Sequence, residues 1–167
     1  MFRCLTSLAL LLLSVTEARA ATWYTFNKNH TDSSLYFFDL DTVVKQGDTT
    51  AIWVKVVDDP ISPGDGGIFA TAIKYNYVCS KRSIQVLTSA NYDKTGKFVR
   101  SFPDLGKISY AIPGSIGEGM LKTVCASDFP KNKSRDFYFQ VEGNDIFKHT
   151  ANYFEHQRAI NTDPAPK

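Results

Sequence analysis

Two cysteines are the residues of this sequence whose side chains are best suited to react with each other. Cys79 and Cys125 belong to no Cys-x-x-Cys pattern and have no histidine near them in sequence, so a metal site or a reactive thiol is the weaker alternative. In an exported protein an isolated pair most often forms a structural disulfide. We therefore expect a Cys79–Cys125 bridge that stabilises the fold.

The remaining candidates for catalysis or metal binding lack the spacing that such chemistry requires. His149 and His156 lie seven residues apart, whereas two zinc ligands on one helix lie about three or four apart. Ser115 has Pro113 where a nucleophile elbow has glycine. We expect no catalytic residue, no metal and no cofactor. A hydrolase with an unrecognised site is the weakest alternative, because paired carboxylates meet only in the fold.

Basic and aromatic side chains are interleaved between residues 81 and 107. If strands present them on one face, they form a surface suited to an acidic protein or a glycan. An ordinary solvated face, with its aromatic rings turned into the core, is the commoner arrangement, because lysines are scattered over any soluble domain. The predicted binding surface consists of Lys81, Arg82, Tyr92, Lys94, Lys97, Arg100 and Lys107.

Short strands are expected to position these residues. Hydrophobic side chains recur at every second position in the segments 52–56, 69–79, 84–88, 108–112 and 137–141. A period of two predicts strands with one buried and one wetter face. Because the separating segments are short and rich in turn residues, they favour antiparallel hairpins over βαβ crossovers.

Two segments have helical spacing instead. Residues 115–126 carry apolar side chains at helical positions, and Ser115 is able to cap the start of the helix, which would bring Cys125 to the strand that holds Cys79. Residues 146–158 form an amphipathic C-terminal helix. The sequence therefore predicts a single α+β domain, an antiparallel β-sheet with a disulfide-tethered short helix and a C-terminal helix.

The first twenty residues have the organisation of a secretory signal peptide. A basic start precedes the apolar run 5–15, and Ala18-Arg19-Ala20 predicts cleavage after Ala20. The run has about half of the roughly 20 residues that span a membrane, so an uncleaved anchor is the weaker alternative. Cys4 precedes the run and is no lipoprotein cysteine. We expect an exported protein of the periplasm or the outer cell surface, not lipid-anchored through Cys4.

The charge balance argues against a nucleic-acid partner. Of 19 basic and 17 acidic residues, Arg3, Arg19 and Glu17 belong to the signal peptide, which leaves 17 and 16. A nucleic-acid-binding domain usually has a clear excess of basic residues. No second apolar stretch of membrane-spanning length follows residue 20, so we expect no transmembrane segment.

The order of several aromatic-rich motifs resembles the surface-adhesin protein E family of Gram-negative bacteria. The resemblance covers roughly residues 23–125 and lies in the order and spacing of the motifs. These are Trp23-Tyr24, Tyr36-Phe37-Phe38-Asp39, Ile52-Trp53-Val54-Lys55, Tyr75-Asn76-Tyr77-Val78-Cys79-Ser80, Tyr92-Asp93-Lys94-Thr95-Gly96-Lys97, Ile112-Pro113-Gly114-Ser115-Ile116-Gly117-Glu118 and then Cys125.

The resemblance implies a division of the chain and a role for it. The expected parts are a cleaved signal peptide (1–20), an adhesin-E-like domain (21–160, with a core at 23–125 and a C-terminal extension at 126–160) and a flexible tail (161–167). The family implies a non-enzymatic, adhesin-like envelope protein that binds host extracellular-matrix proteins. A periplasmic accessory or structural protein without a host ligand is the alternative, and homodimerisation through an open sheet edge stays undecided.

Overall fold

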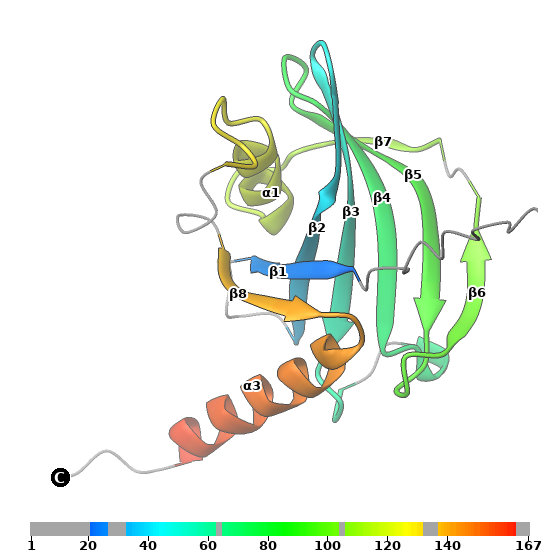
Figure 1. The fold of residues 1–167 in the computed structure, drawn as a ribbon, viewed down its shortest axis with the longest axis vertical. Helices are drawn as coiled ribbons and strands as arrows, with labels where there is room; N and C mark the ends of the chain where they lie inside the picture. Colours follow the sequence, from blue (N-terminus) through cyan, green and yellow to red (C-terminus); the bar gives the residue numbers. More distant parts are fainter. Residues whose placement is uncertain (1–20, 27–32, 63–64, 104–105, 132–136, 163–167) are drawn as a thin grey trace, which may run out of the picture.

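The computed structural model describes residues 21–26, 33–62, 65–103, 106–131 and 137–162 (Figure 1). The predicted signal peptide and residues 163–167 lie outside the described residues. The described strands form one antiparallel sheet in the order β6-β5-β4-β3-β2-β1-β8, with β7 beside β5. The strands are β1 (Thr22–Phe26), β2 (Ser34–Gln46), β3 (Thr49–Asp58), β4 (Ala70–Val78), β5 (Ser83–Tyr92), β6 (Phe98–Phe102), β7 (Ile108–Tyr110) and β8 (Phe137–Glu142).

Tight turns connect the long central strands, as the turn residues predicted. The β2–β3 turn contains Gly47 at φ +57°, a left-handed conformation that glycine adopts without a steric penalty. A short 3₁₀ turn, Asp65–Gly67, precedes β4. β2 through β5 therefore form a meander in which each strand pairs with its neighbour in the sequence. The predicted antiparallel α+β fold is confirmed.

One face of the sheet is covered by the short helix α1 (Ile116–Val124). Ser115 caps its first turn, because the Ser115 hydroxyl accepts a hydrogen bond from the Glu118 amide at 3.2 Å and the Glu118 carboxylate accepts one from the Gly114 amide at 2.9 Å. The apolar side of α1 packs on alternate residues of the strands. This first core cluster contains Tyr24, Phe26, Phe38, Leu40, Ile52, Val54, Tyr77, Met120, Leu121, Val124, Phe129 and Phe137.

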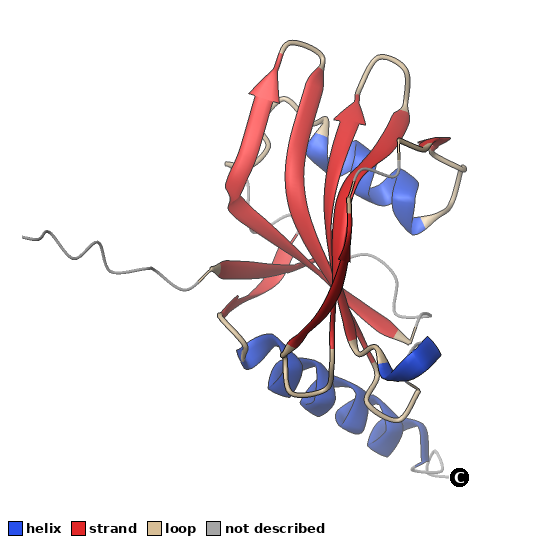
Figure 2. Ribbon diagram, turned by 90° about the vertical axis from the view of Figure 1, so that its right-hand side faces the viewer, coloured by secondary structure: helices blue, strands red, loops and turns tan. Residues whose placement is uncertain are grey.

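The opposite face is covered by the long helix α3 (Asp145–Thr162), so both sides of the central strands are buried. The helices lie near opposite ends of the strands (Figure 2). Arg158 of α3 forms a 2.7 Å ion pair with Asp59, the residue after β3. The second core cluster contains Trp23, Leu35, Phe37, Val57, Ala70, Val141 and Ile146.

Two strand predictions were wrong in detail. The segment 108–112 was expected to bury one face, but only 108–110 forms a strand, and Ile108 and Tyr110 are both exposed. In 137–141 the alternation suggested one shared face. A bulge in the β1–β8 pairing instead places Phe137 in the first cluster and Val141 in the second, because an extra residue in one strand reverses the direction of the side chains.

A disulfide ties α1 to the sheet, as predicted. Cys79 directly follows β4, and Cys125 is the C-cap of α1. Their sulfur atoms are bonded at 2.05 Å and their Cα atoms lie 5.6 Å apart, across a sequence separation of 46. The bridge therefore fixes the covering helix of the first cluster to the end of a central strand.

Replacing Cys79 with serine should destabilise the protein. The loss of a crosslink across a loop of this length costs up to ~4 kcal/mol of unfolding free energy on the chain-entropy model. In protein that begins at Ala21, we expect Cys79→Ser to lower the melting temperature and Cys125 to react with a thiol probe. An unchanged melting temperature would contradict a stabilising role for the bridge.

Candidate binding surface

The residues of the predicted binding surface fall into separate groups along β5. Lys81 and Arg82 lie in the turn before this strand, and Lys94 and Lys97 lie in the turn after it. β5 has 10 residues, so the two turns are separated by ~30 Å at a rise of about 3.3 Å per residue. The structure therefore does not bring these four cations together.

At the first turn, Arg82 makes a structural contact. Its guanidinium lies 2.6 Å from the Glu118 carboxylate, and the Lys122 ammonium lies 3.1 Å from the same oxygen. The Gly114 amide, followed by Lys122 and Arg82, lowers the pKa of Glu118 to about 2. Arg82 thus joins the β4–β5 turn to the capped start of α1, while neighbouring Lys81 is exposed.

At the second turn, Asp93 organises the backbone. One Asp93 carboxylate oxygen accepts hydrogen bonds from the Thr95 amide at 2.8 Å, the Thr95 hydroxyl at 2.7 Å and the Lys97 amide at 3.0 Å. These bonds, with the Thr95 hydroxyl contributing most, lower the pKa of Asp93. The turn therefore has a defined shape, and Lys94 and Lys97 are exposed upon it.

Tyr92 packs on a buried cation inside the domain. The Lys55 ammonium lies 4.7 Å from the centroid of the Tyr92 ring and 4.7 Å from that of Trp23. Lys55 is only 7% exposed, although the alternation in 52–56 had placed it on the wetter face of β3. Burial lowers the pKa of Lys55 to about 8, opposed by the charge of Asp39.

Exposed apolar residues extend along one edge of the sheet, where β6 lies beside the last residues of β5 and β7 beside the first. All five residues of β6 and all three of β7 are exposed. Arg100 and Lys107, two of the predicted residues, lie along this edge with Lys97, and the Arg100 guanidinium lies 5.2 Å from the Phe102 ring centroid. We define the β6–β7 surface as these three cations with Phe98, Val99, Phe102, Ile108, Tyr110 and Ile112.

The sequence analysis named the cations of this surface and left open whether the phenylalanines between them face solvent or the core. Phe98 and Phe102 were expected to turn inward on the commoner reading, and they are 54% and 37% exposed. Tyr110 is 74% exposed. The sequence did contain a signal for exposure at an edge strand. These strands are short and have basic residues between the aromatic ones, and edge strands are often short and carry charges.

The sequence matches a known family, and the match defines the class of this protein. A profile of the family described as surface-adhesin protein E matches residues 23–126. The chain therefore belongs to this family, which confirms the resemblance seen in the motifs. As a member it is an adhesin-like protein. A comparison with curated proteins found no match.

Two solved structures of protein E are similar to this chain. Crystal form II of Haemophilus influenzae protein E has 12% sequence identity and a TM-score of 0.47, and the match covers 62% of this chain and 86% of that one. Protein E from non-typeable Haemophilus influenzae has 11% identity and a TM-score of 0.43, with 80% and 88% covered.

Two further features bear on the class of protein. In the part of the chain that the structure describes, no helix combines the length and the apolar character needed to cross a membrane. Among the same residues no three histidine, cysteine, aspartate or glutamate side chains come together as a metal site. β8 and α3 both lie beyond the residues that the family profile matches.

The buried Lys55 should give the protein a distinctive dependence of stability on pH. Its pKa in the fold is about 8, below the ordinary 10.5, so between these values the unfolded chain binds more protons and the free energy of unfolding rises with pH. We expect a rise of about 1–2 kcal/mol between pH 8 and pH 10 that is absent in Lys55→Met.

Urea unfolding at several pH values measures this difference. Burial raises the pKa of Tyr75 to about 12, so above pH 10 this residue lowers the free energy of unfolding as the pH rises. Both proteins contain Tyr75, so its contribution cancels in the comparison. Lys74→Met, which removes a lysine from the neighbouring strand β4, is the matched control. Parallel curves for the wild type and Lys55→Met would show that Lys55 keeps its ordinary proton affinity.

Proposed function

We propose that this protein is a non-enzymatic binding protein of the bacterial envelope that attaches to a protein partner through the β6–β7 surface. The exposed hydrophobic residues of the β6–β7 surface are the observation that carries the proposal. Exposed apolar residues that follow one edge of a sheet and are accompanied by charged ones often mark an interaction site. Aromatic residues and arginine are also the types most enriched where protein interfaces contribute most to affinity.

The edge position of β6 supports a protein partner in particular. Among the described strands, β6 pairs only with β5, so its other edge is open to a further strand. Phe98 lies opposite Tyr92 and Phe102 opposite Ser89 across a bulge, and both faces of β6 are exposed. A partner segment added at this edge would gain backbone hydrogen bonds and contact apolar side chains on either face.

The charges of the surface favour an acidic partner. The described residues 97–103 and 106–112 include three basic and no acidic residues. Such a surface attracts negative charge and increases the association rate at low ionic strength. Host extracellular-matrix proteins are the partner class we propose, because the family to which the chain belongs is one of surface adhesins.

The alternative is a periplasmic accessory protein whose partner is another envelope protein. The same β6–β7 surface would serve both roles, so the location of the protein separates them. Protease treatment of intact cells should remove a surface adhesin and spare a periplasmic protein. Survival of the protein on intact cells would favour the periplasmic role.

Binding of the purified protein to a panel of matrix proteins, at low and at physiological salt, tests the proposed surface. We expect saturable binding that weakens with salt, because exposed charges are screened. Phe98→Ser and Tyr110→Ser should each raise the dissociation constant about tenfold or more. A loss of affinity of this size is typical of a residue that contributes strongly to an interface. Arg100→Ser should mainly reduce the association rate and the dependence on salt.

Val44→Ser is the matched control, because Val44 is an equally exposed apolar residue (58%) near the far end of β2. It should leave binding unchanged. Equal losses in Val44→Ser and Phe98→Ser would indicate nonspecific hydrophobic adsorption. Failure of every matrix protein to bind would contradict the host-directed version of the proposal.

A further inference from the structure

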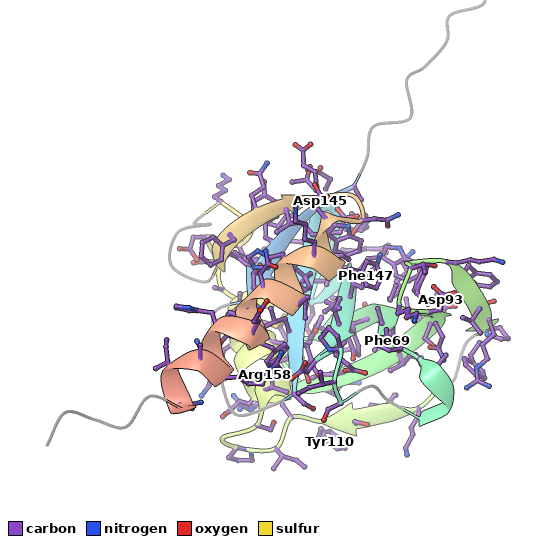
Figure 3. All side chains as sticks on the ribbon, turned by 90° about the horizontal axis from the view of Figure 1, so that it is seen from below. Phe69, Asp93, Tyr110, Asp145, Phe147 and Arg158 are labelled. Atoms are coloured by element: carbon purple, nitrogen blue, oxygen red, sulfur yellow. A yellow bond between two sulfur atoms is a disulfide. The ribbon has the colours of Figure 1, made fainter. Side chains whose placement is uncertain are left out.

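A second site of a different kind lies where α3 begins and β3 ends. A cleft of about 470 Å³ opens there, within the size range of small-ligand sites. Its apolar lining comes from Val57, Phe69, Phe147 and Ala151. Figure 3 shows this region from below, with Phe147 on the first turn of α3 and Phe69 beside the sheet.

The lining of the cleft includes two lysines and one carboxylate, that of Asp58. Lys94 from the β5–β6 turn and Lys148 from α3 both line it, and both are exposed. Within the described residues neither lysine takes part in an ion pair. Two cations contributed by separate elements are therefore available to hold one anionic group.

Asp58 also lines the cleft, but its side chain is directed to the other face of the sheet. One of its carboxylate oxygens accepts a hydrogen bond from the Ser34 hydroxyl at 2.7 Å on the neighbouring strand. Val57 belongs to the cluster that α3 covers, and side chains alternate along β3, so the Asp58 carboxylate lies on the opposite face. The two lysines are therefore the charged groups through which the cleft can recognise a ligand.

The walls of the cleft are held in place by close packing. A β-carbon built on Gly96 would lie only 3.0 Å from the Phe147 ring, so the β5–β6 turn touches this side chain directly. Val57 is 2% exposed and belongs to the second core cluster. Because these walls are already ordered, binding does not require them to give up much conformational freedom.

From this arrangement we propose that the cleft binds amphipathic carboxylates, the chemistry shared by a peptide C-terminus with an apolar last residue and by a free acid with an apolar tail. The carboxylate contacts Lys94 and Lys148, and the apolar part of the ligand packs against Phe147 and Ala151. This site is distinct from the β6–β7 surface, and its occupation does not depend on the function proposed for that surface.

Calorimetric titration of the full chain with three small probes tests the proposal. N-acetyl-L-phenylalanine is expected to bind about tenfold more tightly than its C-terminal amide, which lacks the carboxylate charge. Comparison with 3-phenylpropionate, an acid without the N–H, separates the two sources of such ligands. Weaker binding of this acid indicates peptide termini as the source, whereas equal binding indicates free acids.

Substitution of the two lysines locates the bound probe. Lys94→Ala and Lys148→Ala should each weaken binding of N-acetyl-L-phenylalanine about tenfold, and both should keep the wild-type melting temperature because the two side chains are exposed. Lys81→Ala, an exposed lysine in the β4–β5 turn, should bind like the wild type. Equal binding of the acid and the amide, absence of binding at millimolar concentration, or full affinity in both cleft variants would overturn the proposal.

Discussion

The structure depends on the covering of both faces of one strongly twisted sheet, which α1 and α3 provide in the part of the chain that the structure describes. In Figure 1, β1 and β8 run across the direction of β3–β5. The helix α1 covers one side and α3 the other, and each has its own hydrophobic cluster. Because neither helix reaches far beyond the central strands, β6 and β7 keep exposed side chains. The same limited coverage by helices therefore leaves the β6–β7 surface exposed.

Much of the fold could be predicted from local patterns. Ser115 was expected to cap the start of α1, and its hydroxyl does accept the hydrogen bond from the Glu118 amide. Lys55 shows where the patterns fail. Its charge suggested solvent, but the aromatic rings that cover it come from Trp23 and Tyr92, on strands far from β3 in sequence. Burial by distant segments has no signature in the alternation of one strand.

The candidate sites were less predictable than the fold, for the same physical reason. The cluster of cations between residues 81 and 107 was visible, but a ten-residue strand separates its two ends, so closeness in sequence did not mean closeness in space. Ile108 and Tyr110 looked like core residues because they alternate with polar ones. Only the position of β7 at the edge of the sheet, on the outer side of β5, determines that they face solvent. The cleft includes Phe147 and Lys148 of α3, whose meeting with Lys94 depends entirely on how that helix docks.

The two helices are attached to the sheet in different ways, and this affects whether residues 23–126 have a complete core without the rest of the chain. α1 is covalently bonded to the sheet within residues 23–126, whereas β8 and α3, which complete the other side, come later in the chain. A chain ending at residue 126 would leave β1 as an edge strand and uncover Trp23, Phe37 and the Lys55 ammonium together. The segment that the family profile matches and the segment that completes the core are therefore different lengths of chain.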